Sequence, residues 1–440
     1  MNTKLETAER RSLPPVCANT APKSIWARLA GICGPGLITG ASDDDPSGIA
    51  TYSQVGARFG YALGWTLVFT YPLMCAVQMI SARIGRVTGR GIAGNLRRHY
   101  PNWLVLGMAL LLLIANVINL GANLGAMADA VKLVFGGPAQ LYLVAFALIC
   151  AVLPVYMDYA RYVSVLKWLT LALLAYIATI ALVDVDWGEA LAGMAVPKLS
   201  WDKGYWGMIV AIFGTTISPY LFFWQAEQEA EDTQEHPRRK PLRHAPFQGP
   251  NALQRIGLDT IVGMAASNIV ALAIMLATAA TLHVAGTTEI ETSAQAAEAL
   301  RPVAGPFAAT LFALGIVGTG LLAVPVLGSS AAYAIGEALR WPVGLAQRPR
   351  KAKAFYGTLV VATLVGAGLN FTPVPPMKAL YWAAILNGIV AAPVLLIMML
   401  LSARRDVMGE FTVGGPLRVF GWLTTGLMAA SVVALAATSF

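Results

Sequence analysis

The chain has 440 residues, of which 57% are hydrophobic and only 12% are charged. Soluble domains of ordinary composition carry about 25% charged residues, so this composition excludes an ordinary soluble enzyme or binding domain. Apolar runs of about 20 residues, the length that crosses a bilayer as a helix, recur along the whole chain. These runs are continuous rather than alternating, which argues against a strand barrel. The sequence therefore predicts an all-α integral membrane protein.

The apolar runs predict about eleven membrane-spanning helices. Their approximate ranges are 31–57, 60–82, 103–129, 139–157, 161–183, 205–229, 256–284, 304–339, 354–371, 378–402 and 416–438. Residues 1–28 are polar and are predicted to form an N-terminal tail, not a signal peptide. We expect residues 29–184 and 204–402 to form two halves of five helices each, and residues 403–440 to add one more helix.

The positions of Lys and Arg predict the orientation of these spans. Most of the 31 basic residues fall in the N-terminal tail and in alternate loops. The loops between them hold only Arg58, Lys132, Lys198, Lys203, Arg301 and Lys378. Cytoplasmic loops carry the excess of positive charge, so we expect a multi-pass protein of the plasma (inner) membrane, with its N-terminus in the cytoplasm and its C-terminus outside. This asymmetry explains the net charge of +8 without a nucleic-acid partner.

The first predicted span is interrupted by residues 42–50, which read SDDDPSGIA. Pro46 removes a backbone donor, and Gly48 tolerates dihedral angles that other residues avoid. The stretch leaves two pieces of about twelve residues, each too short to cross the hydrocarbon alone. Irregular backbone persists at membrane depth only where it faces protein or a water-filled cavity. The first span is therefore predicted to be a broken helix that lines such a cavity.

The sixth predicted span is interrupted in a similar way. In residues 214–225, GTTISPYLFFWQ, Pro219 lies mid-span among small hydroxylated residues. The two broken helices are five spans apart. Discontinuous helices at matching places in two halves indicate an inverted-repeat transporter with its binding site near the membrane midplane. We therefore predict a 5+5 inverted repeat in which the first and sixth helices are broken.

Asp43, Asp44 and Asp45 need a reason to lie at this depth. A carboxylate at the bilayer centre costs at least about 2.5–3.5 kcal/mol on insertion scales. Asp43 or Asp44 capping the second half-helix, or an arginine partner, would be a structural reason. No Arg or Lys lies nearby within the spans. A bound metal ion would supply the missing positive charge, helped by the negative ends of the half-helices.

These two stretches resemble the Nramp family of divalent-metal transporters. The resemblance covers the chain from about residue 28 to the last span and is most specific in the stretch GPGLITGASDDDPSG and in the broken sixth span. It implies the fold of amino-acid/sodium symporters, with two inverted five-helix repeats plus extra helices. It also implies a transported divalent cation as the substrate, within the lipid bilayer. The sequence shows no nucleophile–base pair, no cofactor fingerprint and no feature that calls for an obligate protein partner.

The chain departs from the family pattern at its ligands. Nramp transition-metal carriers typically have Asp-Pro-Gly-Asn in the first span. Here the run is Asp45-Pro46-Ser47-Gly48, so that Gly48 takes the Asn position. The family usually has Ala-Thr-Val-Met-Pro-His in the sixth span. Here Ser218 replaces the ligand methionine and Tyr220 replaces the histidine. Both departures remove side chains that suit transition metals.

These substitutions favour a hard cation. A thioether is a soft ligand that favours Mn²⁺, Fe²⁺ or Cd²⁺ over Mg²⁺ and Ca²⁺, and a hydroxyl removes that preference. Mg²⁺ keeps several waters and binds one or two carboxylates. The predicted metal site is made of carboxylates and hydroxyls. Its residues are Asp44, Asp45, Thr215, Thr216 and Ser218. The substitutions resemble those of the Nramp-related magnesium transporter branch, so Mg²⁺ is the expected substrate, with Mn²⁺ sharing the site.

Proton coupling is not expected from this sequence. Proton-coupled Nramps have an Asp and a Glu on the third span, where this chain has Asn119 and Ala122, and Tyr220 and Gln225 replace histidines of the sixth span. A neutral Asn does not shuttle protons at physiological pH. The alternatives are a proton-coupled Mn²⁺/Fe²⁺ carrier in which Asp43 or Asp44 relays the proton and, less favoured because of the three carboxylates, an amino-acid symporter.

A last group of polar residues is predicted to surround the site or its pathway. Its members are Asp43, Gly48, Tyr220, Asn268, Asn387 and Gln54. Asn268 lies on the seventh span at a polar position near the family's site, and Asn387 on the tenth span is placed to approach an occluded ion. Helix-packing hydrogen bonds are an equally open role for Asn268. Gln54 follows the first break and is expected in a vestibule.

Overall fold

The computed structural model describes residues 39–40, 42–156, 169–236 and 238–439. Every regular element in these ranges is helical, with no strand among them, so the predicted all-α class is confirmed. All of the described residues belong to one compact unit, Gly34–Phe440. The predicted N-terminal tail and the start of the first span, up to residue 38, lie outside the described residues.

The described chain is a succession of longer helices with a few short ones between them. The longer helices are α3 (Pro46–Phe59), α4 (Gly64–Thr88), α5 (Ile92–His99), α6 (Asn102–Phe135), α7 (Ala139–Tyr156), α9 (Leu174–Leu182), α10 (Trp187–Ala195), α11 (Lys203–Thr216), α12 (Pro219–Glu235), α13 (Gly249–Thr278), α16 (Ala308–Leu339), α17 (Lys353–Leu369), α18 (Pro376–Ala403) and α20 (Gly415–Ser439). The short ones are η1 (Leu169–Leu173), η2 (Pro246–Gln248), η3 (Ala279–His283), α14 (Ser293–Glu298), α15 (Arg301–Ala304), η4 (Gly305–Phe307), α19 (Arg405–Met408) and η5 (Gly409–Phe411).

Eight described helical segments are long and apolar enough to cross a membrane. They are Gly64–Thr88, Asn102–Phe135, Ala139–Tyr156, Gly204–Glu235, Pro246–His283, Arg301–Leu339, Pro376–Ala403 and Gly415–Thr438. Leu171–Leu182 and Lys353–Leu369 are apolar but shorter. Helices thus lie in the predicted spans wherever those are described, while the total of eleven spans stays a prediction because the first and fifth are only partly described.

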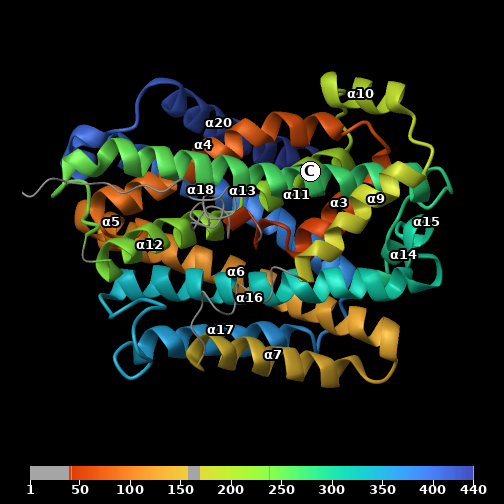
Figure 1. Ribbon diagram of the computed structural model, residues 1–440, viewed down its shortest axis with the longest axis horizontal. Helices are drawn as coiled ribbons and strands as arrows, with labels where there is room; N and C mark the ends of the chain where they lie inside the picture. Colours follow the sequence, from red (N-terminus) through yellow and green to blue (C-terminus); the bar gives the residue numbers. More distant parts are fainter. Residues whose placement is uncertain (1–38, 41, 157–168, 237, 440) are drawn as a thin grey trace, which may run out of the picture. The chain divides into compact units, whose positions relative to one another are not determined.

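The long helices pack in layers (Figure 1). The two helices α7 and α17 run along one side and contact each other, and both contact α6. Next to them lies the pair of α6 and α16, which pack on one another along much of their length. Beyond this pair, α12 packs on α4, α11 on α18, and α13 on α3. The broken elements α3, α11 and α12 are therefore enclosed by unbroken helices.

Glycines set how closely two of these helix pairs approach. A Cβ on Gly56 of α3 would lie 2.2 Å from the Met275 carbonyl oxygen of α13, and one on Gly214 of α11 would lie 2.0 Å from the Ala384 carbonyl oxygen of α18. No larger residue fits without a shift of one backbone. Small residues allow this close approach of helices in lipid, where packing replaces the hydrophobic driving force. The helices that carry the breaks are thus held against α13 and α18.

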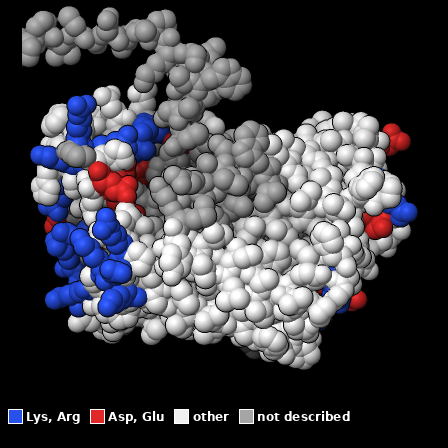
Figure 2. Space-filling view, turned by 60° about the horizontal axis from the view of Figure 1, so that its bottom comes forward, with Lys and Arg blue, Asp and Glu red and all other residues white. Residues whose placement is uncertain are grey.

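On the face seen in Figure 2, the charged side chains at the surface gather at the two ends of the molecule. Lys and Arg gather at one end, which we call the basic end, where α5 lies and where α12 and α16 finish; four arginines, Arg90, Arg97, Arg98 and Arg340, line a single cavity there. At the opposite end few charges occur, of both signs. Arg58 pairs there with Glu289 at 3.4 Å. Basic residues thus gather at one end of the helices, as expected if alternate loops carry most of the Lys and Arg.

Candidate functional site

The first break lies at Asp44 and Asp45. Residues 39, 40, 42 and 43 are helical, and the next helix, α3, begins at Pro46. Asp45 is the N-cap residue of α3, with φ −72° and ψ 168°. Its Oδ1 accepts hydrogen bonds from the Gly48 backbone N–H at 2.9 Å and from the Ser47 hydroxyl at 2.5 Å. Pro46 needs no acceptor at the first helical position. The capping role that sequence reasoning offered to Asp43 or Asp44 thus belongs to Asp45.

The second break lies at Ile217 and Ser218. The preceding helix, α11, ends at Thr216, and α12 begins at Pro219. Ser218 stands at the N-cap, yet its hydroxyl donates back to the carbonyl oxygens of Gly214 and Thr215, both at 2.8 Å. The N-terminal amides of α12 therefore receive no side-chain cap from Ser218. Both predicted breaks are present, and each leaves unwound backbone inside the helical unit.

Asp45 also contacts α6 through its second oxygen. Asp45 Oδ2 accepts from Asn123 Nδ2 at 3.0 Å and from Asn119 Nδ2 at 3.4 Å. The two asparagines are four residues apart and share one face of the helix. All three side chains are buried, with at most 2% of their surface exposed. The sequence analysis placed Asn119 where proton-coupled Nramps have an acidic residue, and it missed Asn123, although the spacing of the two asparagines pointed to the same face.

Asp43 and Asp44 converge on a single hydroxyl of α13. Ser267 Oγ lies 2.8 Å from Asp43 Oδ2 and 3.0 Å from Asp44 Oδ1. A serine hydroxyl carries one proton, so it donates to only one carboxylate at a time. Asp43 Oδ1 is buried and receives no hydrogen bond from any described residue. Ser267 was not predicted, although it directly precedes Asn268 in an otherwise apolar stretch of α13.

The predicted hydroxyl ligands of the sixth helix are turned toward their own backbone. Thr216 donates to the Ile212 carbonyl oxygen at 2.9 Å. Thr215 donates to the same carbonyl at 2.9 Å and lies 3.2 Å from the Tyr52 hydroxyl of α3. The described hydrogen bonds of Thr215, Thr216 and Ser218 therefore do not reach Asp44 or Asp45. The predicted five-residue set is not joined by direct hydrogen bonds in this conformation.

Other predicted residues are scattered around the breaks. The Tyr220 hydroxyl donates to the Ser42 carbonyl oxygen at 3.1 Å and so links α12 to the first half-helix. Gly48 lies next to Tyr52, whose ring would be 3.3 Å from a Cβ at that position. The Asn268 Oδ1 atom, and both amide atoms of Asn387, are buried without a described hydrogen-bond partner. Their predicted roles near the ion stay predictions.

Gln54 does not lie with this group. Its Oε1 accepts from the Ile290 backbone N–H at 2.8 Å, and its Nε2 donates to the Thr288 carbonyl oxygen at 3.0 Å. With Arg58 and Glu289 it lines a cavity of about 330 Å³ at the end opposite the basic end. Gln54 thus holds the segment that follows α13 and η3, while its role in a vestibule stays a prediction.

The three aspartates have no cationic side chain as a partner. Asp43, Asp44 and Asp45 are at most 6% exposed, and no Lys or Arg among the described residues forms an ion pair with them. In this part of the chain, no three His, Cys, Asp or Glu side chains come together as a metal-holding group. Instead, Asp45 accepts hydrogen bonds from α6, and Asp43 and Asp44 lie against the Ser267 hydroxyl of α13. Buried negative charge thus lies at the first break without a cationic side chain beside it among the described residues.

Comparisons with known proteins show which proteins this chain is similar to. The sequence model of the Nramp family, described as "Natural resistance-associated macrophage protein-like", matches residues 36–438. The chain is 26% identical over 414 residues to the divalent metal cation transporter MntH of Burkholderia ambifaria, covering 91% of this chain and 87% of that protein. It is 27% identical over 407 residues to MntH of Klebsiella pneumoniae, covering 90% and 91%.

Solved structures share the fold at low sequence identity. A crystal structure of a manganese transporter from Eremococcus coleocola superposes with a TM-score of 0.71 at 17% identity, covering 95% of this chain and 88% of that one. A Na⁺-coupled sialic acid symporter superposes with a TM-score of 0.59 at 12% identity, covering 92% and 90%. The predicted transporter fold is confirmed by these likenesses, and the chain belongs to the Nramp family.

Proposed function

We propose that this chain is a divalent metal cation transporter of the plasma (inner) membrane that takes up Mg²⁺, and Mn²⁺ with it, as a partly hydrated ion. One observation carries the proposal: three buried aspartates at a helix break have no cationic side chain as a partner among the described residues. Family membership and the divalent metal cation transporters among the relatives support a metal ion as the missing charge. Enzymatic activity is not part of this proposal.

The preference for Mg²⁺ rests on the chemistry of the donors. The aspartates offer carboxylate oxygens, which now accept from the Ser267 hydroxyl and from the side-chain N–H groups of Asn119 and Asn123 and which the ion takes over. Ser218, at the position of the family's methionine, offers a hydroxyl in place of a thioether. Hard oxygen donors suit Mg²⁺ and Mn²⁺, and the absence of sulfur at this position removes a preference for softer ions.

The two breaks supply the mechanical part of the proposal. Tyr220 of α12 binds the Ser42 carbonyl of the first half-helix, so the two broken helices are coupled directly. Asp45 exchanges its bonds to Asn119 and Asn123 for the ion, while Thr215 and Ser218 turn from their own carbonyls toward it. Rocking of the half-helices about this point opens the site to either side in turn. With the basic end facing the cytoplasm, the N-terminus is inside and the C-terminus outside.

Uptake without protons is the second part of the proposal. Two positive charges that move inward gain about 4.6 kcal/mol per 100 mV, from ~2.3 kcal/mol per charge. The groups near the breaks that replace titratable residues are neutral: Asn119 binds Asp45, and Gln225 donates to Thr260 at 3.1 Å. The membrane potential and the concentration gradient then drive transport.

A proton-coupled Mn²⁺ carrier is the second candidate. The solved relative is a manganese transporter, and Asp43 and Asp44 share the single proton of Ser267. Two carboxylates that share a site do not both ionise readily. Asp43 or Asp44 would then carry a proton that the incoming metal displaces. The ordinary family activity is therefore compatible with the same carboxylates.

Uptake into proteoliposomes with an inside-negative potential separates the two candidates. Mg²⁺, Mn²⁺ and Ca²⁺ entry is measured with internal pH for wild type, Asp45→Asn and Asp129→Asn. Asp129 binds Ser293 at 2.6 Å on another part of α6, which makes it the matched control. Mg²⁺ entry that needs Asp45 and leaves internal pH unchanged supports the proposal. Mn²⁺ entry with acidification and no Mg²⁺ entry would replace it with the second candidate. No metal entry at all would refute both.

A further inference from the structure

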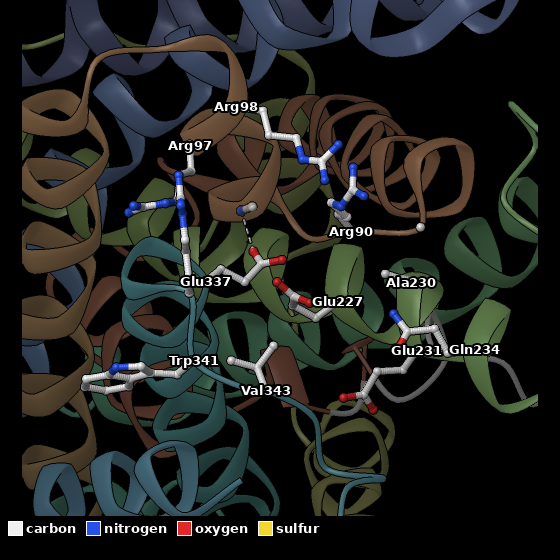
Figure 3. A pocket seen from close by; sticks show the side chains of 13 residues that line it. Arg90, Arg97, Arg98, Glu227, Ala230, Glu231, Gln234, Glu337, Trp341 and Val343 are labelled. Atoms are coloured by element: carbon white, nitrogen blue, oxygen red, sulfur yellow. Dashed lines mark hydrogen bonds between the residues drawn. The ribbon is translucent and has the colours of Figure 1, made fainter. Parts of the chain in front are cut away.

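A second group of buried carboxylates lies near the arginines of the basic end (Figure 3). It borders a cavity of about 660 Å³ between the end of α12, the end of α16 and the segment that leads into α5. Glu227 comes from α12 and Glu337 from α16. Neither residue belongs to the site around the breaks. The helix α12 begins directly after the second break.

Glu337 is held as a hydrogen-bond acceptor by the backbone. Its Oε1 accepts from the Gly91 N–H at 3.1 Å, and its Oε2 accepts from the Gly94 N–H at 2.6 Å. These amides stand at the start of α5, where the helix end favours a negative charge. The two N–H groups and the helix end all stabilise the carboxylate form of Glu337.

Glu227 reaches the same point from the opposite side. A Cβ on Gly91 would lie 1.5 Å from Glu227 Oε1 and 2.7 Å from Glu337 Oε2. Because residue 91 is a glycine, Glu227 Oε1 and Glu337 Oε2 can both occupy the space that a side chain would fill. Glu227 is only 3% exposed, and its Oε1 receives no hydrogen bond from the described residues. Figure 3 shows the two carboxyl groups turned toward each other.

The charged residues around the pair do not neutralise it. Four arginines and one more acid line the same cavity: Arg90, Arg97, Arg98, Arg340 and Glu231. None of these arginines forms an ion pair with Glu227 or Glu337 within the described chain. Arg97 instead donates to the Ala338 carbonyl oxygen. Glu231 accepts from the Tyr333 hydroxyl at 2.6 Å and from the Leu345 N–H at 2.9 Å.

We infer that Glu227 and Glu337 form a proton-binding site, in which Glu227 Oε1 carries the proton and donates it to Glu337 Oε2. Two ionised carboxylates that converge on one buried point would repel each other, whereas one shared proton turns the contact into a hydrogen bond. A divalent cation fits less well, because the arginines of the cavity repel it and the described residues bring no third carboxylate to the pair. The proton comes from the water of the cavity and returns to it.

This proton closes the basic end. It joins α12 to α16 and, through Gly91 and Gly94, to α5. Its loss leaves two negative charges in contact and frees α12 to move. Because the proton enters and leaves on the same side, it does not cross the membrane, and the inference is compatible with uncoupled transport. The expected effect on transport rests on the proposed function. The proton bound between Glu227 and Glu337 does not depend on that function.

Infrared spectroscopy of the purified full-length protein, without metal, tests the bound proton directly. Wild type is compared with Glu227→Gln and with Glu231→Gln, the matched control one turn along α12. At neutral pH we expect a C=O band of a protonated carboxyl group that Glu227→Gln removes and Glu231→Gln keeps. An unchanged spectrum in Glu227→Gln would overturn the inference. If the band that Glu227→Gln removes also disappears from wild type on addition of Mg²⁺, the inference is overturned, because the pair would then be a cation site.

Metal uptake at varied pH on the basic-end side tests the closure. In Glu227→Gln, the side-chain amide still donates to Glu337 and therefore imitates the protonated form at every pH. We expect slower uptake that no longer rises as this pH is raised, while Glu231→Gln keeps the wild-type pH profile. A wild-type profile in Glu227→Gln would refute the closure. The infrared measurement needs no transport, so its result can be interpreted even if the protein does not transport metal.

Discussion

Asp45 Oδ2 accepts a hydrogen bond of 3.0 Å from Asn123 Nδ2, although the two residues are 78 positions apart in the chain. This bond ties the first helix break to α6. The same aspartate caps α3 through its other oxygen. Both oxygens of Asp45 are therefore occupied within the protein, and a metal ion has to displace some of these donors.

Replacing Asn123 tests this exchange. Asn123→Leu removes the shorter of the two α6 donors and leaves a buried carboxylate oxygen with only the 3.4 Å contact to Asn119. Without metal we expect a loss of about 1–3 kcal/mol in the free energy of unfolding. With saturating Mg²⁺ the loss shrinks, because the ion takes over the oxygen. Thermal unfolding with and without Mg²⁺ measures both values.

Asn116→Leu is the control for that variant. Asn116 lies on the same helix, is equally buried, and donates to the Leu327 carbonyl oxygen at 3.1 Å. Its stability loss is expected to be the same with and without Mg²⁺. If Asn123→Leu shows the same loss in both conditions, Asp45 is not a ligand of the ion.

Ser267→Ala removes the hydroxyl that Asp43 and Asp44 share. Without metal the two carboxylates lose their donor, and we expect the protein to be destabilised by about 1–3 kcal/mol. The Kd for Mg²⁺ is expected to fall, because the ion no longer competes with that hydroxyl for the carboxylate oxygens. Isothermal titration of the variant against wild type measures the change. Ser329→Ala, whose buried hydroxyl bonds to Val326 at 3.1 Å within α16, should leave the Kd unaltered.

Gly214→Ala places a methyl group against the backbone of α18. Its Cβ would stand 2.0 Å from the Ala384 carbonyl oxygen, and overpacking of this kind costs about 1–3 kcal/mol. We expect a lower melting temperature and slower uptake, because α11 leads directly into the second break. Gly107→Ala, where no atom lies within 4 Å of the new Cβ, should be neutral or stabilising by up to ~1 kcal/mol. Equal melting temperatures for the two variants would contradict the close crossing.

Gln54→Leu releases the segment that follows η3. Its amide holds the Ile290 N–H and the Thr288 carbonyl oxygen, so we expect faster hydrogen exchange at Ile290 and its neighbours. Mass spectrometry of peptides that cover residues 284–292 measures this exchange. Arg58→Ala serves as the control, because the exposed 3.4 Å pair with Glu289 is worth only ~0–1 kcal/mol. Similar exchange in Gln54→Leu and wild type would show that Gln54 does not hold this segment.

Several features of the fold follow from short stretches of sequence. The apolar runs identify a helical membrane protein because each helix satisfies its own backbone hydrogen bonds within one segment. Pro46 and Pro219 mark the breaks because proline has no backbone N–H, whatever the fold around it. Three adjacent aspartates in an apolar setting mark the candidate site because burial of charge is costly wherever the segment lies. These inferences need no knowledge of the partner helices.

The partners of those residues depend on tertiary structure alone. The sequence pointed to Thr215, Thr216 and Ser218 as the groups facing the aspartates, but the folded chain turns their hydroxyls to their own carbonyls and supplies Ser267, 224 positions from Asp43, in their place. Glu227 and Glu337 likewise meet only because α12 and α16 end beside α5. A side-chain hydrogen bond acts over about 3 Å, so which distant residues form one is decided by how the helices pack and not by any pattern along the chain.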